Sequence, residues 1–452
     1  MNPTSKPIKA LFLLALISAI LLNLGLLRLY HHPTERALIG DEERYLSRAK
    51  QVAASQPVDH HPFWPPLYPE LMGQLFGQFG EDLLSIQIAQ MALWLLSGFL
   101  FGDIAATVFS SRGVGNITLA LFLLNPELIA FSHFLWPEIL HLFCFAVSLW
   151  LLVRWPRRWV CLSVSGIFLG LALLAKQLLL LFIPVILVFV LIKSSGSRKA
   201  RLGKAAVLCF SLIATAFPAA ILTPGLQGYP ISAGSGIFNL WVGLNDKGHR
   251  DYENLVAGRE FVKFDEAGST FSERNRLLLA KIMDLTRERG FISILRSQFG
   301  KQYFRLFHYE TTFTSQLPGG PRQRYTFDSP SLATSLRVYG YLVHGLILGS
   351  GVMGLFLLRL RPLGWQHLFL LFLVYNLGLF SFLHVKTRYL VQILPILIIF
   401  SSLSLHGAFQ AWKQGPQLGS SLSGWTNFRL AGATVCLLAI EWLAFGNLLS
   451  PC

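Results

Sequence analysis

Three consecutive carboxylates, Asp41, Glu42 and Glu43, follow the first long apolar run of the sequence. A carboxylate at the edge of a bilayer can meet water-borne or lipid-borne substrates and take a proton from an acceptor hydroxyl. The alternative is a solvated acidic loop that pairs with the neighbouring Arg44 and Arg48. Position alone favours this second interpretation, so further residues are needed to decide.

Three more charged residues lie within or beside apolar segments, where an ionised side chain is costly and usually faces a cavity or a partner. They are Glu138 in "FLWPEILHLF", Lys176 in "LALLAKQLLLLFIP" and Arg388 in "HVKTRYLVQILPIL". Lysine and arginine both bind phosphate, and arginine does so through two parallel hydrogen bonds. Each residue also has a structural alternative: a carboxylate favoured by a helix N-terminus, a snorkelling lysine and an interfacial arginine anchor.

A metal site has little support in this sequence. "DHHP" offers Asp59, His60 and His61, but adjacent histidines rarely bind one ion by themselves. The five cysteines sit mostly in apolar runs without metal-type spacing, so they imply neither a disulfide framework nor a zinc site. No cofactor is required by these patterns, and metal dependence stays open.

The elements that position these residues are those of a membrane protein. Of the 452 residues, 53% are hydrophobic and 13% are charged, against about 25% charged in an ordinary soluble domain. Segments of about 20 apolar residues, enough to cross a bilayer, predict an all-α membrane domain of about eleven helices over 1–452. The predicted spans are 8–30, 83–109, 115–134, 137–154, 159–175, 177–193, 205–222, 336–359, 364–383, 388–408 and 429–448. We interpret the first as a retained helix, not a cleaved signal peptide.

The charges divide between the two sides predicted for this fold. With the N-terminus inside, the short cytoplasmic segments carry Lys and Arg but no Asp or Glu, which is the positive-inside pattern. Two outer loops hold 19 of the 23 carboxylates, eight in 31–82 and eleven in 223–335. The net charge of +15 therefore reflects topology and not nucleic-acid binding. Carboxylate chemistry is expected outside the cytoplasm.

Both outer loops are expected to contain structured parts. In the first, "DEERYLSRAKQVA" has helical apolar spacing and predicts a short interfacial helix, whereas the prolines of "HHPFWPPLYPELM" predict an irregular turn. In the second, we expect two amphipathic helices near 271–288 and 290–306.

The motifs, taken in order from Asp41 to Pro395, resemble the GT-C superfamily of membrane glycosyltransferases, especially the protein O-mannosyltransferase and aminoarabinose transferase branch. "DEERY" is similar to the family's first outer-loop motif, "PPLYP" to the segment that follows, and "NPELIAFSHFLWPE" to a helix-pair pattern ending in a glutamate. "SGIFNLWVGLND" and "TRYLVQILP" resemble the start of the large outer loop and a late helix. No single motif is specific to this family, but the order of the motifs along the chain and their predicted position on the same side of the membrane are specific to it.

This resemblance implies roles for individual residues. Asp41 would be the catalytic carboxylate with Glu42 beside it, and Lys176 and Arg388 would bind the donor phosphate. Substrate positioning would fall to Glu138, Tyr45, Tyr68 and Tyr389. There is one departure: aminoarabinose transferases usually carry a phosphate-binding lysine just before the proline pair, where this chain has Trp64. Lys176, Arg388 or His61 would have to compensate.

The resemblance implies an inverting transferase that moves one sugar from a polyprenyl-phosphate donor to a glycolipid, polysaccharide or protein acceptor, at the outer face of what we infer to be a bacterial inner membrane. One alternative is a lipid-linked polysaccharide polymerase or ligase, which would depend on arginines of the large loop. Another is a flippase or transporter, which would place charges near the bilayer midplane and show repeat symmetry.

Overall fold

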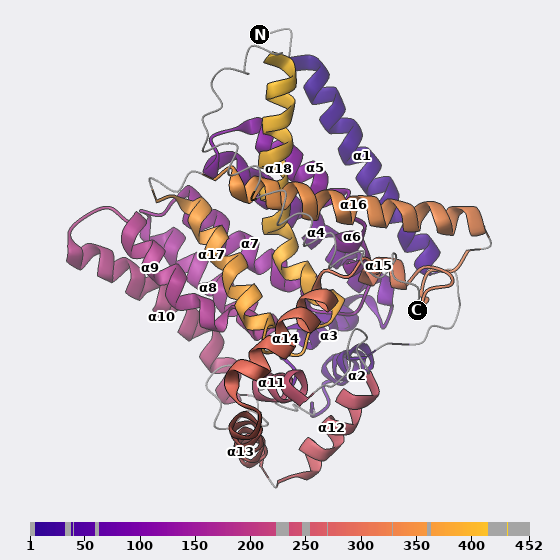
Figure 1. Cartoon of the computed structure of the whole chain (residues 1–452), viewed down its shortest axis with the longest axis vertical. Coiled ribbons are helices and arrows are strands. Elements are labelled where there is room, and N and C mark those ends of the chain that lie inside the picture. The colour runs from indigo at the N-terminus through magenta and orange to yellow at the C-terminus, as the bar shows by residue number, and fades with distance from the viewer. Residues whose placement is uncertain are drawn as a thin grey trace.

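The computed structural model describes residues 5–31, 38, 40–58, 63–222, 235–245, 254–268, 270–327, 329–358, 363–414 and 432. All regular elements within these ranges are helices (Figure 1). They are α1 (Ser5–Tyr30), α2 (Glu42–Ala53), α3 (Leu67–Phe79), α4 (Leu83–Val108), α5 (Arg112–Leu123), α6 (Pro126–Phe131), α7 (Glu138–Arg154), α8 (Trp159–Ala175), η1 (Gln177–Phe182), α9 (Ile183–Lys193), α10 (Arg198–Leu222), α11 (Ser235–Asn245), α12 (Asn254–Glu266), α13 (Phe271–Arg289), α14 (Phe291–Leu306), α15 (Thr312–Ser315), α16 (Pro330–Phe356), α17 (Trp365–Phe380), η3 (Thr387–Tyr389) and α18 (Leu390–Gln414).

Five of the described helical stretches are long and apolar enough to cross a membrane, which supports the predicted all-helical membrane protein. They are Leu13–Tyr30, Leu83–Val108, Arg198–Phe217, Pro330–Phe356 and Thr387–Lys413. Shorter apolar helices include Trp159–Ala175, Gln177–Lys193 and Trp365–Phe380. The predicted count of eleven spans is not confirmed, and its last span, 429–448, lies outside the described residues apart from Gly432.

The span predicted over 115–134 is wrong as a single helix, because the chain breaks between α5 and α6. Asn125 lies at the break, and its side chain accepts a hydrogen bond from the backbone N–H of Leu128 at 3.1 Å. Pro126 begins α6, where the first backbone N–H has no helical partner in any case. The following residues, 132–137, form an irregular buried connection into α7.

The short helix predicted after the first apolar run is present as α2, but the turn after it is shorter than expected. Pro66 precedes the first residue of α3, and Pro69 lies in its first turn. Proline is tolerated there because the first backbone N–H groups of a helix have no carbonyl to bond. The expectation that Pro69 breaks the helix was therefore wrong.

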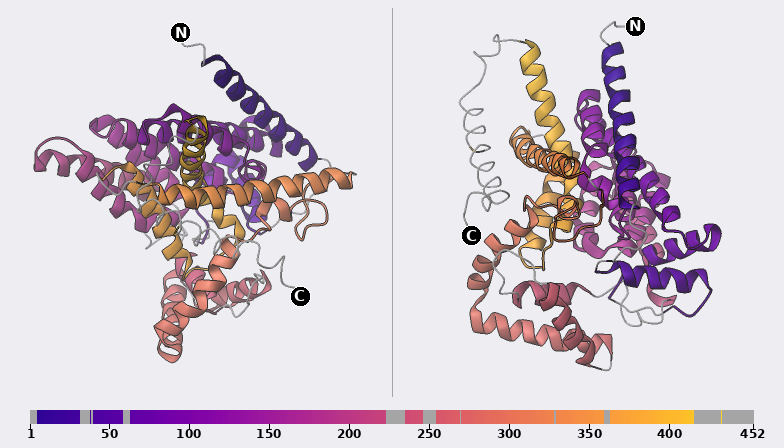
Figure 2. Two further views of the ribbon diagram at one scale, coloured as in Figure 1. Left: turned by 45° about the horizontal axis from the view of Figure 1, so that its top comes forward. Right: turned by 90° about the vertical axis from the view of Figure 1, so that its right-hand side faces the viewer.

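The two amphipathic helices expected in the large loop are confirmed as α13 and α14. Figures 1 and 2 show α2 and α11 to α13 together at one end of the molecule, opposite the N-terminal end of α1. Phe63 of the first loop joins them, since its ring lies 5.2 Å from the ring of Phe238 and 5.1 Å from that of Phe261. The two loops thus share a small aromatic core at this end.

The apolar helices α8 and α10 pack closely against each other. A Cβ added to Gly166 of α8 would lie 2.3 Å from the carbonyl oxygen of Leu208, and one added to Gly170 would lie 2.9 Å from that of Leu212. Small residues at such spacing let two helix backbones approach in a membrane protein. The C-terminal end of α8, which leads into Lys176, is held against α10 in this way.

Candidate active site

Asp41 is placed by helix α2 without serving as its cap. It occupies the N-cap position, where an aspartate usually accepts a bond from the helix backbone, but its side chain makes no such bond. Instead, its carboxylate accepts hydrogen bonds from the indole N–H of Trp64 at 3.1 Å and from a guanidinium nitrogen of Arg388 at 2.9 Å. The acid is therefore oriented by tertiary contacts and is 30% exposed.

The surroundings of Asp41 set its charge. Burial alone would raise the pKa of this carboxyl, but the positive charges of Arg388 and Lys386, together with the hydrogen bonds from Arg388 and Trp64, outweigh burial and lower it to about 2. The carboxylate is thus ionised throughout the physiological range. It can orient a hydroxyl group, although its basicity is low while Arg388 remains bound.

Asp41 opens onto a cavity of about 1060 Å³ between the two loops and the apolar helices. The sequence predictions converge here, because Glu138, Lys176, Arg388, Tyr45 and Tyr389 also line this cavity. Arg388 and Asp41 are 347 positions apart in the chain. Much of the remaining wall is apolar, with leucine and aromatic side chains from the segment after α8, from α17 and from the large loop.

Glu138 and Lys176 form a second ion pair on the wall. Glu138 is the first residue of α7, and Lys176 lies in extended backbone at the break between α8 and η1. The Lys176 ammonium donates to Glu138 Oε1 at 2.9 Å and lies 5.1 Å from the ring centre of Tyr389. The other Glu138 oxygen, Oε2, is buried and has no hydrogen-bond partner. A buried acceptor of this kind is costly unless something binds it.

Aromatic rings hold Arg388 in place. Its guanidinium lies 5.1 Å from the ring centre of Trp136 and 5.5 Å from that of Tyr389, within the range of cation–π attraction. The Tyr389 ring in turn stacks on Phe380 at 5.8 Å between ring centres. These contacts orient the guanidinium group, and one of its terminal nitrogen atoms donates a hydrogen bond to the Asp41 carboxylate.

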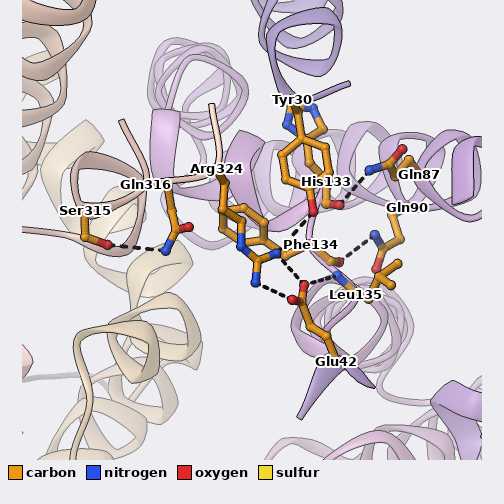
Figure 3. Close-up of polar contacts among 10 residues, drawn as sticks. All are labelled: Tyr30, Glu42, Gln87, Gln90, His133, Phe134, Leu135, Ser315, Gln316 and Arg324. Atoms are coloured by element: carbon orange, nitrogen blue, oxygen red, sulfur yellow. Dashed lines mark hydrogen bonds and ion pairs between the residues drawn. The ribbon is translucent and has the colours of Figure 1, made fainter. Parts of the chain in front are cut away.

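Glu42 points away from the cavity, although it is the immediate neighbour of Asp41. Figure 3 shows its carboxylate bound by the guanidinium of Arg324, with one bond at 2.8 Å, and by the backbone N–H of Leu135 at 2.9 Å. The side chains of Glu42 and Arg324 are 0% and 1% exposed. A second Arg324 contact reaches the Tyr30 hydroxyl at 3.2 Å. Glu42 and Arg324 together therefore connect α1, α2 and the two irregular segments that contain Leu135 and Arg324.

The segment at 132–137 receives further support from α4. The Gln90 amide donates to the carbonyl oxygen of Ser132 at 3.1 Å. It also donates to the carbonyl oxygen of Phe134 at 3.0 Å (Figure 3). Tyr68 donates its hydroxyl hydrogen to Gln90 Oε1 at 2.9 Å. Tyr68, predicted to position substrate, is thus buried behind the cavity wall, and its ring contacts that of Tyr45 at 5.4 Å.

The other sequence predictions divide into exposed and undescribed residues. Glu43 is exposed, as expected of a solvated neighbour. Asp59, His60 and His61 lie outside the described residues, so their expected metal or phosphate roles stay predictions. Within the described ranges, no three His, Cys, Asp or Glu residues form a group suited to a metal ion.

Sequence reasoning missed several polar residues of the cavity wall, among them Lys386, Arg322 and Trp64. Lys386 lies in "HVKTRY" just before Arg388, and Arg322 lies in "PGGPRQRY" of the large loop. Trp64 was noted only as a missing lysine, whereas its indole N–H binds Asp41. Proximity to Arg388 in the sequence was a signal for Lys386. No local pattern distinguished Arg322 from the other arginines of the loop.

A family model described as dolichyl-phosphate-mannose-protein mannosyltransferase matches residues 60–221. No curated protein matches the chain significantly. Among solved structures, the chain is similar to the apo oligosaccharyltransferase of Archaeoglobus fulgidus, with 15% identity, a TM-score of 0.49, and coverage of 95% of this chain and 55% of that one.

Two further structures are similar. One is the same archaeon's oligosaccharyltransferase AglB in complex with an inhibitory peptide and a dolichol-phosphate, at 14% identity and TM-score 0.49, covering 96% of this chain and 55% of that chain. The other is ArnT from Cupriavidus metallidurans bound to undecaprenyl phosphate, at 13% identity and TM-score 0.40, covering 91% and 80%. This chain thus spans about half the length of the archaeal enzyme. The family match covers residues 60–221 of the 452-residue chain.

Proposed function

We propose that this protein is an inverting glycosyltransferase that moves a monosaccharide from a polyprenyl-phosphate donor to an acceptor hydroxyl at the extracytoplasmic face of a bacterial inner membrane. The acceptor is a glycolipid, a polysaccharide or a protein. The observation that carries this proposal is the cavity itself, which is lined by an oriented carboxylate, Asp41, and by the cationic side chains of Arg388 and Lys176. The family that matches residues 60–221 is named for a lipid-phosphate-linked sugar donor.

The shape of the cavity wall suits a lipid carrier. Its apolar part includes Leu178 and Leu181 from the segment after α8, and Leu379 and Leu383 from α17 and the residues after it. Apolar side chains on the wall of a cavity favour isoprenoid chains, whereas charged side chains favour the phosphate and the sugar. The donor would therefore lie with its lipid along these leucines and its phosphate near Arg388.

The transfer step follows from these positions. The acceptor oxygen attacks the anomeric carbon from the face opposite the phosphate, the bond from that carbon to the phosphate oxygen breaks, and Asp41 accepts the hydroxyl proton. The lipid phosphate leaves as an anion that Arg388 and Lys176 stabilise. A phosphate leaves readily without a general acid. Glu138, with its unpaired oxygen, would hold a sugar or acceptor hydroxyl.

The Asp41–Arg388 pair links donor binding to base strength. While Arg388 contacts Asp41, the carboxylate has a low pKa and is a weak base. A donor phosphate that draws the guanidinium away would raise the pKa of Asp41, since an opposite charge would be lost from its side. The base would thus become stronger when the leaving group is in place.

The test uses the purified protein in detergent, a panel of short-chain polyprenyl-phosphate sugars and, as acceptors, a membrane extract that contains glycolipid, polysaccharide and protein. We expect at least one donor to release its polyprenyl phosphate with the sugar transferred, and the new glycosidic bond to have the opposite anomeric configuration. Retention of configuration would contradict the single-displacement mechanism. No turnover of any donor across a broad panel would contradict the enzyme class.

A further inference from the structure

Lys176 lies where the chain leaves one helix and enters the next. Helix α8 ends at Ala175, the backbone of Lys176 is extended, and η1 begins at Gln177. The last carbonyl groups of a helix have no partner within it, and a buried backbone group without a hydrogen bond is costly. The break that carries the Lys176 ammonium to the cavity wall therefore needs hydrogen bonds from other parts of the fold.

His141 of α7 supplies one of these bonds. Its Nδ1 lies 2.9 Å from the carbonyl oxygen of Ala172, which also accepts the backbone N–H of Lys176 at 2.8 Å. A carbonyl oxygen can only accept, so Nδ1 carries the proton of this bond. Ala172 lies in the last turn of α8, where the helix dipole favours a donor. His141 thus holds the end of α8 just before Lys176.

The same face of α7 also contacts the side chain of Lys176. Glu138 comes three residues before His141, and side chains at this spacing share one face of a helix. The Glu138 carboxylate accepts a hydrogen bond from the Lys176 ammonium at 2.9 Å, whereas His141 reaches the backbone four residues before Lys176. Both α7 side chains are buried. Helix α7 therefore contacts both the charged end of Lys176 and the helix end that leads into it.

Tyr375 of α17 holds the backbone on the other side of the break. Its hydroxyl donates to the carbonyl oxygen of Leu178 at 2.6 Å, two residues after Lys176. The Tyr375 ring also lies 5.2 Å from the ring of Phe182, the last residue of η1. Two side chains from different helices therefore bind the backbone around Lys176, one before the break and one after it.

We propose that His141 and Tyr375 are positioning residues, which hold the backbone on either side of Lys176 so that its ammonium lies where the donor phosphate binds. This inference rests on the proposed function, in which Lys176 contacts that phosphate. The ammonium of a lysine sits on a flexible four-carbon stem, so it is directed only if the backbone that carries it is fixed. A misplacement of about 1 Å by a change far from the chemistry is enough to cost much of a group's contribution.

The experiment measures equilibrium binding of a short-chain polyprenyl monophosphate and of the matching polyprenol to the purified protein in detergent. The ratio of the two affinities reports the phosphate contact, because both ligands carry the same apolar chain. Leucine and asparagine are nearly equal in size, but only asparagine offers an N–H in place of Nδ1. We expect His141→Leu and Tyr375→Phe each to lower the ratio about tenfold, the size of one hydrogen bond at the upper end of its range. His141→Asn should keep the ratio close to that of wild type.

The matched control is Tyr339→Phe, which removes a tyrosine hydroxyl that donates to the backbone carbonyl of Leu124 away from the cavity wall, and it should leave the ratio unchanged. General loosening of the fold would weaken binding of the phosphate and of the alcohol alike. An unchanged ratio in folded His141→Leu or Tyr375→Phe would therefore overturn the positioning role of that residue, as would equal losses in His141→Leu and His141→Asn.

Tyr375→Phe removes a single oxygen atom, so it decides by the same ratio if His141→Leu does not fold. Failure of the proposed function gives a different result. In that case the wild-type protein itself would bind the monophosphate and the polyprenol equally, because it would make no phosphate contact.

Discussion

Replacing Glu42 with Gln separates a structural role for this residue from a catalytic one. The Glu42 carboxylate is fully buried and binds the Arg324 guanidinium and the Leu135 backbone N–H. The change keeps the size of the side chain and one oxygen atom, but it removes the negative charge. Arg324 would then remain as a buried cation without its carboxylate partner, close to the Tyr30 hydroxyl at 3.2 Å.

The expected cost is large because neither side chain is exposed to water. Removing one partner of a buried ion pair destabilises a protein by about 3–5 kcal/mol, and the oxygen kept by Gln makes the lower end of that range the expectation. The adjacent Glu43 is exposed, so Glu43→Gln is a matched control that should stay within about 0.5 kcal/mol of wild type. The two variants remove the same charge from neighbouring positions.

The measurement is the free energy of unfolding in mixed micelles, together with sugar transfer at a temperature at which both variants are folded. We expect Glu42→Gln to lose stability and to retain measurable transfer. A Glu42→Gln protein that unfolds like Glu43→Gln would refute the argument from burial. If that stable variant also had no transfer activity, Glu42 would be a catalytic helper, as the family resemblance implies.

Three further predictions concern the cavity. Trp64→Phe removes the N–H bond to Asp41 and keeps an aromatic ring, so kcat for transfer should fall about tenfold; an unchanged kcat in steady-state kinetics would show that this bond does not orient the acid. Glu138→Gln leaves the Lys176 ammonium without a carboxylate partner, so KM should change more than it does in the exposed Glu43→Gln control, and equal KM values would contradict a substrate-binding role for the pair. The pKa of Asp41 is lowered to about 2, so its ion pair contributes fully to the stability of the folded protein above the unfolded pKa near 3.8, and this contribution is lost as the pH falls towards 2. The difference in the free energy of unfolding between wild type and Asp41→Asn should therefore be constant from pH 8 to 5. A loss of that difference near pH 6 would contradict the assignment.

Sequence patterns predicted the elements better than their contacts. The amphipathic periodicity of α13 and α14 is local, so it was readable from the chain alone. The order of the predicted spans put Asp41 and Arg388 on the same side, against the division of charges, but their contact joins residues 347 positions apart and depends on the tertiary structure. The break between α5 and α6 was missed although Asn125 and Pro126 signal it locally, because the apolar residues on either side together reach the length of one span.

The site was hard to predict from the sequence mainly because neighbouring residues carry the same chemical group. Asp41 and Glu42 look alike in "DEERY", and the family resemblance implied that they act together. The structure directs one to the cavity and the other to Arg324, because α2 turns successive side chains to different directions around its axis. Trp64 illustrates the reverse case, since a residue noted as a departure from the family pattern donates a hydrogen bond to the predicted base.

The central claim, that Asp41 is the base of a glycosyl transfer, is tested most directly by measuring transfer from a panel of short-chain polyprenyl-phosphate sugars by wild-type, Asp41→Asn and Glu43→Gln proteins. Asn keeps the shape of the side chain and can still accept the Trp64 bond, but it cannot take a proton at useful strength. We expect wild type and Glu43→Gln to transfer the sugar at similar rates and Asp41→Asn to lose at least about a hundredfold, as is typical when a general base is removed. Full transfer by folded Asp41→Asn would contradict the claim.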